Sequence, residues 1–181
     1  MTDPDHRDKY HPAVHDIYLA LYAGHRDDPA TWSPMQLTRV LTATLASRHH
    51  SWRVIGITEA ALYKFAEMDF RYISRCGITR AHLVERKTTV HAMFDRPAPL
   101  TFLEFSNLIW ERDRTVLTAR GENKNGFVPQ YIPIENEDGN LFSERGQLAL
   151  WKHGKAEREF LRAMHARLVE GELNIRHPPT P

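Results

Sequence analysis

The feature of this sequence that most constrains its fold is a set of five segments with the apolar periodicity of amphipathic helices. In each segment apolar residues recur at steps of three and four, and residues that start or stop helices stand at the ends. Ser33-Pro34-Met35-Gln36 and the pair Thr101 and Glu104 have the composition of capping boxes, and Gly24 is placed to stop the first helix. The predicted helices are residues 12–23, residues 34–45, a stretch capped by Thr58 that ends before Gly77, residues 101–112 and residues 154–170.

Three short segments between these helices are predicted to be strands. Residues 78–85 roughly alternate, residues 115–118 are rich in β-branched side chains, and residues 130–134 contain Pro133, which favours the edge of a sheet. The acidic stretch 135–143 is typical of a turn. We therefore expect an α+β fold, mainly helical, with a small antiparallel sheet.

The length of 181 residues suits one compact domain, and 41% apolar with 26% charged residues is an ordinary globular composition. We expect a single folded domain over residues 11–172, with flexible ends at 1–10 and 173–181. The single cysteine, Cys76, excludes an intramolecular disulfide and favours a reducing compartment. Without a signal-peptide pattern or an apolar run long enough for a membrane span, we expect a cytoplasmic protein with no membrane contact.

The net charge is only +1, but the charges are unevenly distributed. Basic residues outnumber acidic ones within residues 70–125 and again within residues 151–167, whereas the first 69 residues lean acidic. The molecule as a whole is therefore not an electrostatic binder of nucleic acid, although its two basic zones could converge in the fold. The alternative is that both zones are solvated faces balanced by nearby acids.

Histidine occurs 11 times, which raises the question of a metal site. His11 and His15 have the i, i+4 spacing at which two imidazoles on one helix face share an ion, but the HExxH glutamate is missing. Exposed polar positions are the favoured interpretation of this pair. His49-His50 fit the negative end of a helix dipole, and His153 and His165 are expected at the surface.

The segment GITRAHLVERK, residues 77–87, brings ionisable groups of both signs onto a predicted strand. Arg80 and His82 share one face of that strand, and a guanidinium beside an imidazole favours its neutral form, which a general base or metal ligand requires. Glu85 follows at the strand end as a further candidate catalytic residue. The alternative is a half-buried strand histidine whose ring is bonded to a backbone carbonyl.

The segment TVLTARGENKNG, residues 115–126, is predicted to be a strand that runs into a turn and then a basic, asparagine-rich start of a helix or loop. With His82 on an earlier strand, this pattern resembles the HNH endonucleases, the ββα-metal nucleases. It resembles in particular phage-type members in which a strand ends in a threonine, a basic residue and a Glu-Asn pair. In that family a histidine on the first strand is the general base for water, and a His or Asn on the helix binds the divalent metal.

Carried over by position, the resemblance implies that His82 is the catalytic base and Asn123 the metal-side residue, with Asn125 or Glu122 as helpers. His82 and Asn123 would then hold Mg²⁺ or Mn²⁺, and the substrate would be DNA or RNA. The residues expected to bind its phosphates are Arg80, Arg86, Lys87, Arg120 and Lys124.

The chain departs from this family pattern in the residue before His82 and in the connection between the two strands. Ala81 stands where the family usually has an acid or a histidine, and the connection is longer than usual and contains its own predicted helix. The final histidine is also absent, because no histidine lies between His91 and His153.

Two functions remain open from the sequence. One is a metal-dependent nuclease with His82 as general base. The other is a non-enzymatic module that binds nucleic acid or a protein through the basic zones 70–125 and 151–167, with Trp110 and Trp151 either stacking on bases or packing in the core. Proximity of His82 and Asn123 would favour the nuclease. We also expect Arg80, His82 and Arg120 to share a basic pocket that binds an anion such as phosphate.

Overall fold

The computed structural model describes residues 12–45, 53–71, 73, 76–123, 129–135, 139–141 and 154–178. The segment 1–10 and the last three residues lie outside these ranges. So do several residues discussed above: His11, His49, His50, Lys124, Asn125, Trp151 and His153.

Six helices and four strands form within the described residues, so the expected α+β class is confirmed. The helices are α2 (Pro12–Asp27), α3 (Pro34–Leu45), α4 (Glu59–Ala66), α5 (Arg86–Phe94), α6 (Phe102–Arg112) and α7 (Lys155–Val169). The strands are β1 (Arg53–Ile57), β2 (Ile78–His82), β3 (Arg114–Ala119) and β4 (Ile132–Pro133).

The four strands form one sheet in the order β2-β3-β1-β4. β3 pairs antiparallel with β2 and parallel with β1, while β4 is an edge strand antiparallel to β1, as Pro133 predicted. The sheet is therefore mixed, and the expectation of an antiparallel sheet is wrong for β1 and β3. The reason is that β1 was not predicted: its short RVIGI segment is buried almost throughout and lacks the alternation of a strand with one wet face.

Capping residues define the helices where the sequence placed them. The Thr58 hydroxyl accepts a hydrogen bond from the backbone N–H of Ala61 at the start of α4, and Thr101 and Glu104 form the predicted capping box of α6. Gly24 does not stop the first helix, because the N–H of Asp28 still donates to its carbonyl oxygen. A side chain at that position would collide with the indole of Trp32, so the glycine serves close packing instead.

Helix α5 replaces the end of the predicted strand 78–85. The strand stops at His82, and Glu85 becomes the residue that precedes α5. No helix was predicted here, because the segment RKTTVHAMF has little apolar periodicity and opens with charged side chains.

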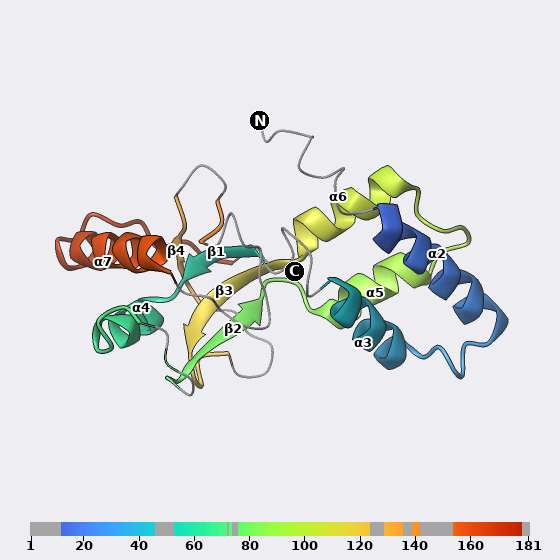
Figure 1. Cartoon of the computed structure of the whole chain (residues 1–181), viewed down its shortest axis with the longest axis horizontal. Helices are drawn as coiled ribbons and strands as arrows, with labels where there is room; N and C mark the ends of the chain where they lie inside the picture. Colours follow the sequence, from blue (N-terminus) through green and yellow to red (C-terminus); the bar gives the residue numbers. More distant parts are fainter. Residues whose placement is uncertain are drawn as a thin grey trace.

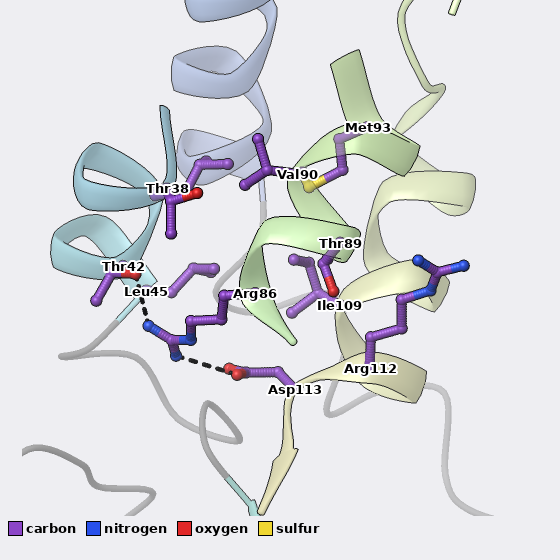
Figure 2. Close-up of a pocket in the computed structure, with 11 residues that line it drawn as sticks. Thr38, Thr42, Leu45, Arg86, Thr89, Val90, Met93, Ile109, Arg112 and Asp113 are labelled. Carbon is purple, nitrogen blue, oxygen red and sulfur yellow. Dashed lines mark hydrogen bonds and ion pairs between the residues drawn. The ribbon is translucent and has the colours of Figure 1, made fainter. Parts of the chain in front are cut away.

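Helices α2, α3, α5 and α6 gather at one end of the molecule and enclose a core of their own (Figure 1). Tyr18 lies at its centre: its hydroxyl donates to the Met93 carbonyl at 2.9 Å and accepts from the Leu100 N–H at 2.8 Å. Burial raises the pKa of this phenol, and its ring stacks on Phe105 with 5.2 Å between centroids. Figure 2 shows the inner side of this core, where Val90 and Met93 of α5 lie near Ile109 of α6.

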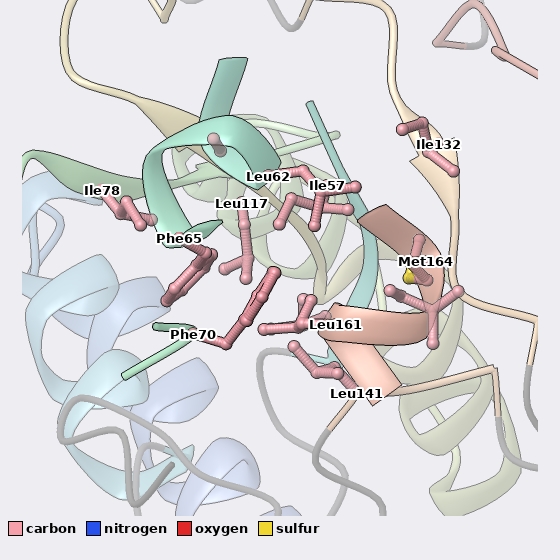
Figure 3. Close-up of a cluster of buried hydrophobic side chains, with 13 residues drawn as sticks. Ile57, Leu62, Phe65, Phe70, Ile78, Leu117, Ile132, Leu141, Leu161 and Met164 are labelled. Carbon is pink, nitrogen blue, oxygen red and sulfur yellow. The ribbon is translucent and has the colours of Figure 1, made fainter. Parts of the chain in front are cut away.

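A second core fills the space between the sheet and helices α4 and α7. Figure 3 shows Ile57 and Leu117 of the sheet facing Leu62 and Phe65 of α4, with Leu161 of α7 beside them. Oδ1 of Asn140 accepts a hydrogen bond from the backbone N–H of Val54 at 2.9 Å. This bond ties the predicted turn after β4 to the sheet.

Residues beyond 172 make contacts with the sheet. Leu173 packs against the second core, and Arg176 exchanges two backbone hydrogen bonds with Tyr131 at 2.9 and 2.8 Å. The segment 173–176 therefore lies along the sheet next to β4.

The chain passes between the two cores several times. After β2 it leaves the sheet, forms α5 and α6, and returns as β3, which pairs with the strand it left. His82 and Arg114 consequently lie where the helical part joins the sheet.

The first prediction concerns the helical core. Replacing Phe105 by alanine should lower the free energy of unfolding by about 3–5 kcal/mol, because the ring is fully buried and its removal leaves a cavity. The exposed neighbour Leu103, on the same helix, provides the control: Leu103→Ala should change the value by less than about 0.5 kcal/mol. Urea unfolding of both variants measures this, and equal effects would contradict the described packing of α6.

Candidate functional site

The candidate site lies at the junction of the helical part and the sheet, where His82 ends β2 and Arg86 begins α5. Glu85 stands between them, exposed, and its side chain makes no capping hydrogen bond. The short connection turns the chain so that the Arg86 side chain comes back onto the imidazole of His82.

The Arg86 side chain donates hydrogen bonds to residues from three other parts of the chain. Its Nε donates to Nε2 of His82 at 3.0 Å, its Nη1 to Oγ1 of Thr42 at 2.7 Å, and its Nη2 to Oδ1 of Asp113 at 3.1 Å. Figure 2 shows the bonds to Thr42 and Asp113. The guanidinium thus joins β2, α3 and the end of α6 in one network, which we call the junction network.

The ion pair in the junction network is largely buried, with side-chain exposures of 18% for Arg86 and 8% for Asp113. Burial lowers the pKa of Arg86 from its ordinary value, and the charge and hydrogen bond of Asp113 oppose that shift. The two charges therefore stabilise each other, because removing one would leave the other largely buried without its ionic partner.

The network also engages one ring nitrogen of His82. Its Nε2 accepts the hydrogen bond from Arg86, an arrangement that corresponds to the tautomer with a proton on Nδ1. Oδ1 of Asp113 lies 3.7 Å from the same nitrogen, beyond hydrogen-bond distance. The sequence predicted Arg80 as the guanidinium beside His82, and the structure adds Arg86, whose Nε donates to the His82 ring.

A small space adjoins this network. The space between α3, α5 and α6 beside Arg86 and Asp113 measures about 30 Å³ and is lined mainly by apolar atoms. It has room for one or two water molecules. At this end of β2 the residues of the junction network are packed against one another.

Asn123 lies at the other end of the β2–β3 pair. His82 is opposite Thr115, whereas Ile78 is opposite Ala119, and Asn123 follows Ala119 after a turn. Four residue steps of strand, about 13 Å, separate the two ends of this ladder. The structure does not bring His82 and Asn123 together.

Glu122 closes the turn before Asn123. Its Oε2 accepts from Oγ1 of Thr58 and from the N–H of Ala119, both at 2.6 Å. These bonds tie the end of β3 to the start of α4, so Glu122 has a structural role in this turn.

Arg120 also lies at this far end, because its N–H donates to the Gly77 carbonyl oxygen at 2.6 Å. The expected approach of His82 to Arg120, and with it their shared anion pocket, is wrong. The reason is the antiparallel register, which sets the end of β2 opposite the start of β3. Arg80 lies in the middle of β2, opposite Leu117, and Lys87 is exposed on α5.

Two residues of the junction network, Asp113 and Thr42, were not singled out from the sequence. Asp113 did leave a signal: an acid at the C-terminal end of a predicted helix is unfavourable to the helix dipole, which suggests a tertiary partner. Thr42 carried no such signal, because threonine is common on exposed helix faces.

His82 and Asn123, the two predicted metal ligands, lie at opposite ends of the β2–β3 pair. Among the described residues no group of three or more His, Cys, Asp or Glu side chains could hold an ion. The Nε2 atom of His82 faces a guanidinium, whose charge opposes a divalent cation at the same atom. His15 is also engaged elsewhere, since its Nε2 lies 2.9 Å from the Leu100 carbonyl oxygen.

The structure also shows the surroundings of Trp110 and His165. Trp110 is partly buried and packs against the guanidinium of Arg53, which lies 3.6 Å from the centre of its ring. His165, expected at the surface, is partly buried with its ring edge-on to Tyr63 and Phe70.

The comparisons with known proteins assign no family or function to the chain. No family model, curated protein or solved structure matches the chain significantly. None of the helices in the described ranges combines the length and apolar character that a membrane crossing requires.

The second prediction tests the buried ion pair. Asp113→Ala should lower the free energy of unfolding by about 3 kcal/mol, because it leaves the Arg86 charge buried without its partner. The double variant Arg86→Met/Asp113→Ala should recover part of this loss, since no buried charge remains. Glu67→Ala, which breaks the exposed pair with Lys64, is the control and should cost less than about 1 kcal/mol. Equal losses in Asp113→Ala and Glu67→Ala would contradict a buried network.

Proposed function

We propose that this protein cleaves phosphodiester bonds of DNA or RNA as an HNH-like nuclease, with His82 as the general base. The observation that carries the proposal is the antiparallel pairing of β2 with β3. These are the two segments on which the resemblance rests, and they pair although α5 and α6 intervene in the chain. A ββα nuclease requires such a strand pair.

The state of His82 supports the same proposal. A general base needs a neutral imidazole with a lone pair toward water, and the bond from Arg86 places that lone pair on Nε2. If Arg86 releases the imidazole, its guanidinium keeps Asp113 and Thr42 as acceptors. Nε2 then takes a proton from water, the water oxygen bonds to phosphorus, and the bond from phosphorus to the leaving oxygen breaks as that oxygen takes a proton from solvent.

The HNH resemblance also implies Mg²⁺ or Mn²⁺, a cation that would stabilise charge on the phosphate oxygens. His82 and Asn123 do not fit as its joint ligands, because they occupy opposite ends of the strand pair. We therefore assign no step to a metal held by these two residues. Metal dependence remains part of the proposal and is tested in the assay below.

The same separation favours a second candidate, a module that binds nucleic acid without cleaving it. In this alternative the junction network is structural, and the exposed basic residues alone meet the phosphates. Both candidates predict binding of nucleic acid, and they differ in whether His82 does chemistry.

The third prediction separates them. Purified protein incubated with plasmid DNA and with RNA in Mg²⁺ or Mn²⁺ should produce cleavage products, and His82→Ala should reduce the rate at least about 100-fold, because the general base is lost. His91→Ala is the matched control, since His91 is a histidine paired with Asp95 outside the junction network. EDTA should stop the reaction.

Two results would remove the nuclease proposal. One is absence of cleavage under every metal condition in protein shown by circular dichroism to be folded. The other is cleavage whose rate is the same in His82→Ala and His91→Ala, which would identify a contaminating enzyme or another base.

A further inference from the structure

A hollow of about 180 Å³ lies between the turn that follows α4 and the first two turns of α7. Both basic zones of the sequence contribute to it. Its lining is four basic and two acidic residues: Arg71, Lys155, Arg158, Arg162, Asp69 and Glu159. We call it the α7 hollow.

The helix geometry explains why these bases face one side. Lys155, Arg158 and Arg162 stand at i, i+3 and i+7 on α7, which places them on a single face. The opposite face contributes Leu161 and Met164 to the core beside the sheet. These three basic residues therefore lie on the solvent side of α7, beside the turn that follows α4.

The other wall of the hollow depends on an unusual turn. Asp69 and Phe70 both have positive φ angles, 51° and 56°, in the left-handed region that side chains other than glycine seldom adopt. A hydrogen bond from the Phe70 N–H to the Phe65 carbonyl at 2.8 Å holds the turn. As a result the Phe70 ring enters the core, while Asp69 and Arg71 stay outside beside α7.

Arg162 is anchored against this wall. Its guanidinium donates to Oδ1 of Asp69 at 2.8 Å and lies 5.2 Å from the centre of the Phe70 ring. The other cations are held loosely: Lys155 is 3.6 Å from Glu159, and Arg71 is 3.7 Å from Asp69. Side-chain exposures of 81% for Lys155, 65% for Arg71 and 51% for Arg162 leave these charges accessible to a ligand.

The surplus of positive charge, together with the positive end of the α7 dipole, selects an anion. From Lys155 to Arg162 the helix rises about 10 Å, a length that spans more than one phosphate of a nucleic-acid strand. The cations are therefore spread along the helix rather than placed at one level of it. The hollow therefore fits successive phosphates of a polymer better than one free phosphate.

One more contact favours nucleic acid over a polyanion without bases. His165, one turn beyond Arg162 on α7, lies 5.2 Å from the ring of Tyr63, which is exposed on α4. An exposed tyrosine at the end of a row of cations offers a face on which a base can stack.

We infer that the α7 hollow binds the phosphate backbone of a nucleic-acid strand, with Tyr63 as a stacking platform at one end. The identity of the ligand rests on the proposed function, whereas the presence of an anion site does not. None of the residues that line the hollow belongs to the junction network, so binding there would not involve His82.

Binding of a fluorescent single-stranded oligonucleotide in EDTA tests this inference. Arg158→Gln and Arg162→Gln should each weaken binding about 10-fold at low salt and reduce the salt slope by about 1, because each removes one phosphate contact. Arg167→Gln removes an equal charge from α7 outside the hollow and should leave the affinity within about 2-fold, since its contact is with Glu172. Tyr63→Leu should weaken binding of the oligonucleotide but not of heparin.

The outcomes separate this inference from the nuclease proposal. Unchanged affinity and salt slope in both Arg158→Gln and Arg162→Gln, with folding verified by thermal melting, would overturn the inference even if His82-dependent cleavage is observed. Equal losses in Arg167→Gln would also overturn it, because they would show only the general basicity of α7. Loss of binding in the two hollow variants, with no cleavage by the wild type, would uphold the hollow and reject the nuclease.

Discussion

The arrangement of this protein depends on one buried guanidinium, that of Arg86. The chain leaves the sheet at His82 and returns at Arg114, and Arg86 and Asp113 stand just inside these two points. Their ion pair connects the start of α5 to the end of α6, and the hydrogen bond from Arg86 to Thr42 connects both to α3. Removing a guanidinium from water is costly, and three directed acceptors offset that cost here. The helical core and the sheet are thereby joined through polar contacts as well as packing.

This arrangement separates the two regions that could act on a ligand. His82 is part of the junction network, half-buried and bonded, whereas the basic residues of α7 are exposed and form an open hollow on another part of the molecule. A nucleic-acid strand bound in the hollow would have to extend around the sheet to reach His82. The proposed cleavage and the inferred binding are thus distinct properties, and either can hold without the other.

The local parts of the fold could be predicted from the sequence because their causes are local. Thr58 and the pair Thr101 and Glu104 specify helix starts through hydrogen bonds within three residues, and Pro133 marks an edge strand through its missing N–H. Helix α5 was missed because its segment lacks apolar periodicity, and its position is set by tertiary contacts such as those of Val90 and Met93.

The candidate site was harder to predict because it depends on pairing over long distances in the chain. That His82 would meet Arg86 follows from where β2 ends, and that Asn123 would not meet His82 follows from the register of β2 against β3. No pattern within either segment encodes that register, since α5 and α6 lie between them. Asp113 was recognisable only as an acid misplaced for the helix dipole.

The most direct test of this account is the tautomer of His82, measured by long-range ¹H–¹⁵N NMR of the histidine side chains at neutral pH. The account predicts a neutral ring with the proton on Nδ1 and an unprotonated Nε2, because Arg86 donates to that atom. Arg86→Gln should shift the Nε2 resonance of His82 while the exposed His91 stays unchanged. A proton on Nε2 of His82 in the wild type, or resonances indifferent to Arg86→Gln, would contradict the junction network and with it the assignment of His82 as a poised base.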